Sequence, residues 1–271
     1  MNIAYQLYGL RDIVDADPEG TLGQLAAAGY ETIEFVGSPA HDFQTVRALP
    51  ATLPALEAHG LRMVSSHVTL DDLAFADELF PQLREHGAEY ALVAYVAPEL
   101  RATREQVSQL TSTLNEAGAK AREHGLRFGY HHHAFEFEPF DGTTVFDLME
   151  AELDPQLVFW ELDVYWLARG ARDQAADIAA QAGRVPLLHV KDMASDAWVG
   201  NYEQGDGADE RASFVPVGTG FFDWPAILGA AREAGTEWCV VEQDFSTRPF
   251  EDAATSLRNL REQLAEAKAG S

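Results

Sequence analysis

Carboxylate and imidazole side chains stand directly after short apolar runs at intervals along this 271-residue chain. Buried carboxylates are costly unless they are paired, hydrogen-bonded or bound to a metal ion. Two glutamates, one aspartate and one histidine make a hard to borderline ligand sphere that suits Mn²⁺, Mg²⁺, Co²⁺ or Zn²⁺. We therefore predict one divalent metal site; the alternative is that the same residues form separate salt bridges and helix caps. The predicted ligands are Glu136, Asp163, His189 and Glu242.

The cysteine content narrows the choice of metal. Cys239 is the only cysteine, so the sequence allows neither an internal disulfide nor a zinc site built from thiolates. Most of the predicted donors are carboxylate oxygens, which favours Mn²⁺ among the four candidate ions.

A metal site of this kind points to proton transfer next to a carbonyl group. A divalent ion can bind a carbonyl and its neighbouring hydroxyl together and acidify the adjacent C–H. One carboxylate removes that proton to give an enediolate at the metal, and a second carboxylate returns a proton. We predict Glu136 and Glu242 as this pair. Return to the same carbon is epimerisation, return to the neighbouring carbon is isomerisation, and loss of a β-substituent is dehydration or glycosidic cleavage.

Four more residues are candidates for contact with the substrate. His67, His133 and Lys191 could bind substrate hydroxyls or a developing oxyanion. Trp166 could form an apolar wall against one face of a sugar. Three of them have a plainer alternative: His67 could be a hydrogen-bonded core histidine, Lys191 could pair with Asp192, and Trp166 could pack in the core.

The elements that must position these residues are short strands alternating with longer amphipathic helices. The predicted strands are nearly continuous apolar runs, which is typical of parallel strands covered on both faces. They span residues 3–7, 32–35, 62–66, 90–96, 127–131, 157–162, 186–190 and 238–242. Predicted helices at 18–28, 45–59, 71–86 and 101–124 are each followed by a glycine, the residue that commonly ends a helix.

Eight strands alternating with helices predict an α/β fold, a single (β/α)8 barrel that occupies residues 1–271 as one domain. A doubly wound sheet that binds nucleotides would carry a glycine-rich loop after its first strand, and QLYGL at 6–10 is no such loop. In a barrel the C-terminal ends of the strands share one mouth, which would bring the candidate residues together. The polar segment 194–216 is then expected to be a loop on this face, where it could reshape the pocket or contact another subunit.

Five segments, in order, resemble motifs of the xylose-isomerase-like sugar phosphate isomerase/epimerase barrels. They are YHHHAFEF at 130–137, ELDVYW at 161–166, LHVKD at 188–192, VGTGFFDW at 217–224 and VEQD at 241–244. The first resembles the family's Tyr-His-Asn-His-x-x-Glu-Phe, the third its His-x-Lys-Asp and the fourth its Gly-x-Gly-x-x-Asp-Trp. Relatives include ketose 3-epimerases, hydroxypyruvate isomerases, inosose dehydratases and lyases of 3-keto-glycosides.

The resemblance implies a single divalent ion at positions matching Glu136, Asp163, His189 and Glu242. Two features depart from the family pattern. His132 stands where relatives often carry asparagine, so a contact with the substrate or with a ligand is expected to differ. The segment 194–216 is longer than the expected connection.

Net charge limits the classes of partner. The chain has 19 basic and 44 acidic residues, a formal charge of −25, which disfavours nucleic acids and anionic membranes. This opposes a DNA-repair endonuclease, which would also need a multi-zinc cluster and a basic groove. With no apolar stretch of the roughly 20 residues that a membrane helix needs and no signal-peptide pattern, we expect a cytoplasmic protein. The resemblance also allows a homo-oligomer.

The expected function is therefore a metal-dependent isomerase or epimerase of carbohydrate metabolism, acting on a keto-sugar or related polyol. A lyase or dehydratase of the same fold is the alternative reaction. A non-catalytic sugar-binding barrel is the alternative from another class, and the intact set of four predicted ligands speaks against it.

Overall fold

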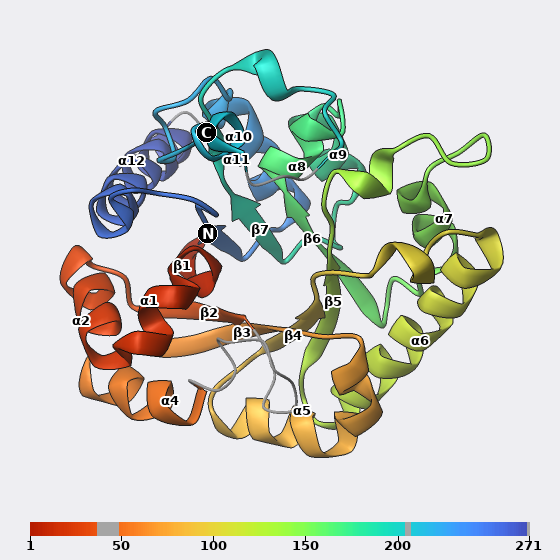
Figure 1. Cartoon of the computed structure of the whole chain (residues 1–271), viewed down its shortest axis with the longest axis horizontal. Coiled ribbons are helices and arrows are strands. Elements are labelled where there is room, and N and C mark those ends of the chain that lie inside the picture. Colours follow the sequence, from red (N-terminus) through yellow and green to blue (C-terminus); the bar gives the residue numbers. More distant parts are fainter. Residues whose placement is uncertain (37–48, 204–206, 270–271) are drawn as a thin grey trace.

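A closed barrel of eight parallel strands forms the centre of the structure (Figure 1). This computed structural model describes residues 1–36, 49–203 and 207–269. The strands follow the order β1-β10-β7-β6-β5-β4-β3-β2, and β1 closes the ring by pairing with both β10 and β2. The barrel strands are β1 (Asn2–Gln6), β2 (Thr32–Val36), β3 (Arg62–Val68), β4 (Tyr90–Val93), β5 (Arg127–His131), β6 (Val158–Asp163), β7 (Leu187–Val190) and β10 (Trp238–Val241).

Helices surround the barrel, as Figure 1 shows. Short 3-10 helices lie between many of the strands and helices. The α-helices of six or more residues in the described ranges are α1 (Arg11–Ala16), α2 (Pro18–Ala28), α4 (Leu49–Ala58), α5 (Ala76–Glu85), α6 (Arg104–Glu123), α7 (Val145–Glu152), α8 (Val164–Arg169), α9 (Gln174–Ala180), α11 (Trp224–Ala234) and α12 (Pro249–Ala269). The 3-10 helices are η1 (Leu7–Leu10), η2 (Asp71–Phe75), η3 (Pro98–Leu100), η4 (Phe135–Phe137) and η5 (Asp196–Trp198).

This architecture confirms the predicted (β/α)8 barrel. The predicted helix 18–28 has the bounds of α2, and Gly29 ends it with φ +103°, a left-handed conformation that glycine adopts without strain. The predicted helix 71–86 divides into η2 and α5. The first residues of the predicted helix 45–59 lie outside the described ranges. None of the described helices is both long and apolar enough to cross a membrane.

Apolar side chains pack on both sides of the strands. The larger core lies between the strands and the surrounding helices. A smaller core fills the inside of the barrel, since alternate residues of each strand point inward. Its members are Ala4, Val64, Tyr90, Leu92, Phe159, Leu187, Trp238 and Val240. The next inward position on several of these strands lies nearer the C-terminal end, and it is there that the polar residues appear.

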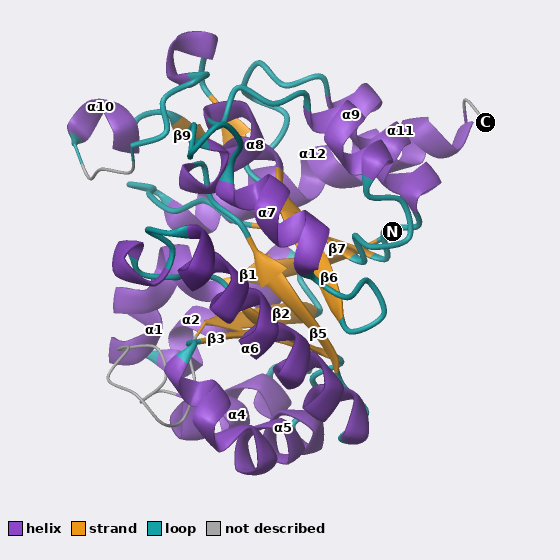
Figure 2. Cartoon of the chain, turned by 90° about the vertical axis from the view of Figure 1, so that its right-hand side faces the viewer, coloured by secondary structure: helices purple, strands orange, loops and turns teal. Residues whose placement is uncertain are grey.

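The chain makes an excursion between β7 and α11. Segment 194–216, expected to be an irregular loop, contains η5, helix α10 (Ala208–Arg211) and strand β9 (Phe214–Val215). Strand β9 pairs antiparallel with β8 (Asp192–Met193), outside the barrel sheet. Figure 2 shows β9 and α10 near α8, at one end of the barrel. The excursion therefore lies where it can help to enclose the mouth.

Candidate active site

A polar layer lies directly above the inner apolar core. On β6, Glu161 and Asp163 continue the inward face that begins with Phe159, and all three are buried. On β7, His189 follows the inward Leu187 in the same way. Because strand residues alternate between the two faces, the apolar inward residue on each of these two strands is followed two positions later by an ionisable one. Ionisable side chains from different strands therefore lie at the same depth inside the barrel.

His189 is the centre of this layer. Its Nδ1 lies 2.7 Å from Glu242 Oε2 and 3.7 Å from Asp163 Oδ2. Its Nε2 lies 2.7 Å from Glu34 Oε1 and 3.0 Å from Glu161 Oε2. Burial opposes a charge on the ring, but the carboxylates of Glu161 and Glu34 outweigh burial and raise the pKa of His189 well above its usual value. Both ring nitrogens therefore face carboxylates.

Lys191 is the buried cation of the site. Its Nζ lies 2.8 Å from Asp244 Oδ1, 2.9 Å from Glu242 Oε2 and 3.1 Å from Asp163 Oδ2. Burial alone would lower the pKa of Lys191, but these three carboxylates raise it well above its usual value. Burial alone would also raise the pKa of Glu242, yet Lys191 and His189 lower it to about 2. Lys191 and Glu242 are thus a charged pair at neutral pH.

The carboxylate of Glu161 contacts three imidazoles that come from different strands. Its Oε2 lies 2.8 Å from His67 Nε2, 3.0 Å from His131 Nδ1 and 3.0 Å from His189 Nε2. Burial would lower the pKa of His67, but Glu34 and Glu161 raise it to about 9. Burial lowers the pKa of His131 well below its usual value, which leaves that ring neutral. Glu161 is therefore a fully buried residue that contacts three histidines of the site.

The structure places Glu136 apart from this layer. It lies in η4, beyond the end of β5, where its Oε1 accepts from Tyr130 Oη at 2.7 Å and its Oε2 from the backbone N–H of His133 at 2.8 Å. The β5 side chain that approaches the other predicted ligands is instead His131, whose Nε2 is 3.9 Å from Asp163 Oδ2. Past the end of β5 the alternation of faces no longer applies. The carboxylate of Glu136 points back toward β5 and stabilises the turn through these two hydrogen bonds. The expected four-residue grouping is thus not formed with Glu136 in it.

Replacing Glu136 with glutamine is expected to reduce the pH dependence of stability. Burial raises the pKa of Glu136 from 4.5 to about 7, so between these values the folded state keeps a proton that the unfolded chain releases. The free energy of unfolding therefore falls as pH rises through this window, by about 3 kcal/mol at ~1.4 kcal/mol per pH unit. Glutamine does not ionise, so the free energy of unfolding of the variant should not fall in this way.

Urea unfolding of both proteins from pH 4.5 to 8 measures this effect, and the variant should gain relative to the parent as pH rises. A difference in unfolding free energy that stays constant over the range would contradict the argument.

His132 links two strand ends. Its Nδ1 donates to the carbonyl of His133 at 3.0 Å, and its Nε2 accepts from the backbone N–H of Asp163 at 3.1 Å. Burial lowers the pKa of His132 to about 3, which keeps the ring in the neutral form that can both donate and accept. An asparagine side chain also carries one donor and one acceptor group, which accounts for either residue type at this position. His132 therefore positions Asp163.

Asp192 has a structural task rather than a pairing with Lys191. Its Oδ2 accepts from Gly218 N at 2.8 Å, Gly220 N at 3.0 Å and Trp224 Nε1 at 2.9 Å. A Cβ on Gly220 would come within 2.2 Å of Asp192 Oδ1, so this turn requires glycine. The two motifs that contain Asp192 and the glycines are thus one hydrogen-bonded unit beside the barrel mouth.

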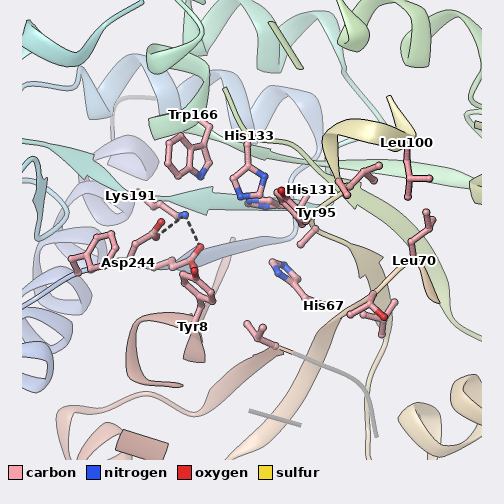
Figure 3. Close-up of a pocket in the computed structure, with 18 of the residues that line it drawn as sticks. Tyr8, His67, Leu70, Tyr95, Leu100, His131, His133, Trp166, Lys191 and Asp244 are labelled. Carbon is pink, nitrogen blue, oxygen red and sulfur yellow. Dashed lines mark ion pairs between the residues drawn. The ribbon is translucent and has the colours of Figure 1, made fainter. Parts of the chain in front are cut away.

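The polar layer opens into a cavity of about 760 Å³ (Figure 3). The four predicted substrate-contact residues all line it, together with His131 and Glu242. The four are His67, His133, Lys191 and Trp166. Lys191 Nζ lies 5.3 Å from the centroid of the Trp166 ring. A cavity of this size falls within the range of small-molecule sites, ~300–1,000 Å³.

Two overlapping sets of buried donors could hold a metal ion in the described part of the chain. One is Asp163, His189 and Glu242; the other is His67, His131, Glu161 and His189, and in each the donor atoms lie within 4.8 Å of one another. Asp163 Oδ2 accepts no hydrogen bond from the described residues, although Lys191 Nζ lies 3.1 Å away. In the first set, His189 Nδ1 faces the two carboxylates while Nε2 is free to donate to Glu34 or Glu161. A second-nitrogen contact of this kind is what metal-binding histidines usually have.

A family model described as "Xylose isomerase-like TIM barrel" matches residues 22–263. The chain belongs to this family. Among curated proteins, an inosose dehydratase of Geobacillus thermodenitrificans is 28% identical over 173 residues, which are 59% of this chain and 55% of the relative. The chain thus matches about half the length of that relative.

Two solved structures have similar folds over nearly the whole xylose isomerase-like barrel. A sugar phosphate isomerase/epimerase from Parabacteroides distasonis has a TM-score of 0.74 at 24% identity and covers 96% of this chain and 93% of its own. A xylose isomerase-like TIM barrel protein from Mycobacterium smegmatis, in complex with magnesium, has a TM-score of 0.70 at 16% identity and covers 98% and 97%. At these identities the two structures support the fold alone.

Three residues in the polar layer of this xylose isomerase-like barrel were not predicted from the sequence. Glu34, His131 and Glu161 are each at most 2% exposed and contact the other site residues. The available signal was the two-residue alternation that relates Glu161 to Asp163 on β6. His131 carried the same signal, because it shares its inward face with Gly129 on β5.

Proposed function

We propose that the protein is a metal-dependent enzyme that moves a proton next to the carbonyl group of a keto-sugar or related polyol. The observation that carries the proposal is the grouping of Asp163, His189 and Glu242, of which Glu242 lines the cavity. Isomerase, epimerase and dehydratase relatives in the family support this reaction class. We also propose that residues 1–271 act as one barrel domain.

Asp163, His189 and Glu242 would hold the metal ion, with His131 as the residue from β5 available to complete the set. The oxygen-rich donors favour Mn²⁺, and Mg²⁺, Co²⁺ or Zn²⁺ fit the same chemistry. When bound, such an ion polarises a carbonyl and its neighbouring hydroxyl as a Lewis acid. His131 fits the task because burial keeps its ring neutral and its Nε2 lies 3.9 Å from Asp163 Oδ2.

The remaining roles follow from what lines the cavity. Glu242 is the member of the first donor set that reaches the cavity, and its ionised carboxylate can accept a proton from substrate. Lys191, held by three carboxylates, presents a positive charge toward developing negative charge on a substrate oxygen. His67 and His133 offer ring nitrogens from other strands for substrate hydroxyls and for the returning proton. Trp166 supplies an aromatic wall.

Loss of water is the second candidate reaction. Its support is that the curated relatives are inosose dehydratases, with 23–28% identity over 58–60% of this chain. Both reactions begin with the same proton removal, and they differ in whether a hydroxyl leaves from the next carbon.

Uptake of deuterium from solvent into candidate keto-sugars and inososes tests the proposal. NMR in D₂O should show metal-dependent exchange at the carbon next to the carbonyl, and mass spectrometry of the product separates exchange from dehydration. Exchange that persists at an unchanged rate after verified removal of metal would refute the proposal.

Removal of metal with EDTA is expected to lower the melting temperature by about 5–10 °C. A ligand at 100 times its Kd stabilises the folded state by about 2.7 kcal/mol, and each kcal/mol shifts the melting temperature by about 2–4 °C at this chain length. The ion would also relieve repulsion between Asp163 and Glu242. Differential scanning calorimetry with elemental analysis measures both quantities. Adding Mn²⁺ back should restore the melting temperature, and an unchanged value after confirmed metal loss would contradict the prediction.

A further inference from the structure

The cavity has two chemically different ends (Figure 3). Lys191, Asp244 and Tyr8 lie together at one end, and Leu70 and Leu100 lie at the other, with His67 and His131 between them. The first end contains the ion pairs of Lys191 with the surrounding carboxylates. A substrate that fills this cavity therefore meets several charged groups at one end and mainly apolar side chains at the other.

The apolar end is built by the last residue of β3 and by the chain that follows β3 and β4. Val68 and Val96 form its buried wall at 3% and 1% exposure. Leu100 and Tyr95 stand at the same end with 42% and 51% of their surface exposed. Asp71 is the charged side chain among the described lining residues of these two segments. Large apolar side chains left exposed inside a cavity indicate a surface that a ligand covers.

This wall is held in place before any ligand binds. The ring of Tyr95 meets Phe135 edge-on at 5.9 Å between centroids, and it meets His133 at 6.3 Å. The guanidinium of Arg101 covers the ring of Phe135 at 3.8 Å. Because Tyr95 is already packed, little side-chain order has to be gained on binding, which favours affinity for a flat apolar group.

An unsubstituted sugar or cyclitol does not match this arrangement. Such rings carry hydroxyls around their whole edge, and a hydroxyl placed against Val96 or Leu100 would lose its hydrogen bonds to water without replacement. The volume of about 760 Å³ corresponds to about 25 water molecules at ~30 Å³ each. The cavity therefore has room for more than the single sugar or cyclitol ring that would bind at its polar end.

We propose that the substrate is a carbohydrate or cyclitol bearing an uncharged apolar substituent, such as an aryl group. The sugar part sits at the Lys191 end, and this placement rests on the proposed function. The apolar substituent packs against Leu70, Val96 and Leu100. Asp71 at the apolar end disfavours an acidic substituent.

Paired ligands without a carbonyl group test this inference by binding alone. The probes are the phenyl and methyl β-glycosides of glucose and galactose, and the phenyl and methyl ethers of myo-inositol, titrated calorimetrically with and without Mn²⁺. Burial of a phenyl ring should make the aryl member of at least one pair bind about 10- to 100-fold more tightly. If no aryl member binds more tightly than its methyl partner, including the case in which neither binds, the proposal is overturned.

Matched variants locate the effect. Leu100→Asn should remove most of the aryl advantage and leave the Kd of the methyl partner unchanged. Ile13→Asn is the control, because Ile13 is 38% exposed on α1 and does not line the cavity. An aryl advantage that survives Leu100→Asn would place the substituent elsewhere and overturn the assignment. Failure of deuterium exchange with the aryl preference intact would instead count against the proposed function only.

Discussion

Glu242→Gln is expected to lower the rate of solvent deuterium uptake by about 100- to 10,000-fold, the range that a positioned acid–base group contributes. Glu242 lines the cavity, lies 2.7 Å from His189 Nδ1 and is kept ionised by Lys191 at 2.9 Å. Glutamine keeps the shape of the side chain but cannot accept the proton, and it removes one anionic metal donor. Single-turnover exchange measured by NMR, together with elemental analysis of the purified variant, separates loss of proton transfer from loss of metal.

The matched control is Glu237→Gln. Glu237 directly precedes β10, so it stands at the opposite end of the strand that leads to Glu242, and it makes a half-exposed ion pair with Arg127. Its replacement should leave the exchange rate within about twofold, since exposed ion pairs contribute roughly 0–1 kcal/mol. Equal losses in the two variants would mean that Glu242 acts only through general stability or charge.

Glu136→Gln and His131→Gln decide which residue of the β5 region belongs to the site. If His131 completes the donor set, His131→Gln should lower metal content and Glu136→Gln should leave it near that of the parent. The reverse pattern would restore Glu136 as a ligand and overturn the assignment made from the structure.

The barrel was predictable from sequence because its signals are local. Apolar runs of strand length, a helix after each run, and glycines such as Gly29 at the helix ends all act within a few residues. The strand ends that supply Asp163, His189 and Glu242 follow from the same pattern. Which side chains meet inside the barrel depends on the alternation of faces along each strand. The sequence predicts this alternation within a strand but not in the turn that follows it.

The positions of the Glu136 and Arg169 side chains could not be predicted from this pattern. Glu136 lies beyond the end of β5 in a 3-10 turn, where the direction of a side chain is set by hydrogen bonds to Tyr130 and His133. Arg169 was not predicted to matter, yet it is fully buried, and its partners Asn201 and Glu210 lie 32 and 41 residues later in the chain. Contacts of that sequence separation leave no periodic mark.

Arg169 holds the excursion between β7 and α11 against the barrel. From α8 its Nε donates to the carbonyl of Asn201 at 2.6 Å, its Nη1 to Glu210 Oε1 at 2.8 Å, and its Nη2 to the carbonyl of Glu203. The guanidinium also lies 5.0 Å from the centroid of Trp198. Glu210 lines the cavity, so this cluster joins the position of the excursion to the shape of the site.

Arg169→Met is therefore expected to lower the free energy of unfolding by about 3–5 kcal/mol, the cost of leaving one partner of a buried ion pair uncompensated. Arg172→Met is the control, since its ion pair with Asp177 is more exposed and should contribute less than about 1 kcal/mol. Adding Glu210→Met to Arg169→Met should recover part of the loss, because the stranded carboxylate is then removed. Urea unfolding of the parent, the three single variants and the double variant measures these differences. Strictly additive losses from Arg169→Met and Glu210→Met would show that the guanidinium acts through its packing and carbonyl contacts alone, and not through the ion pair.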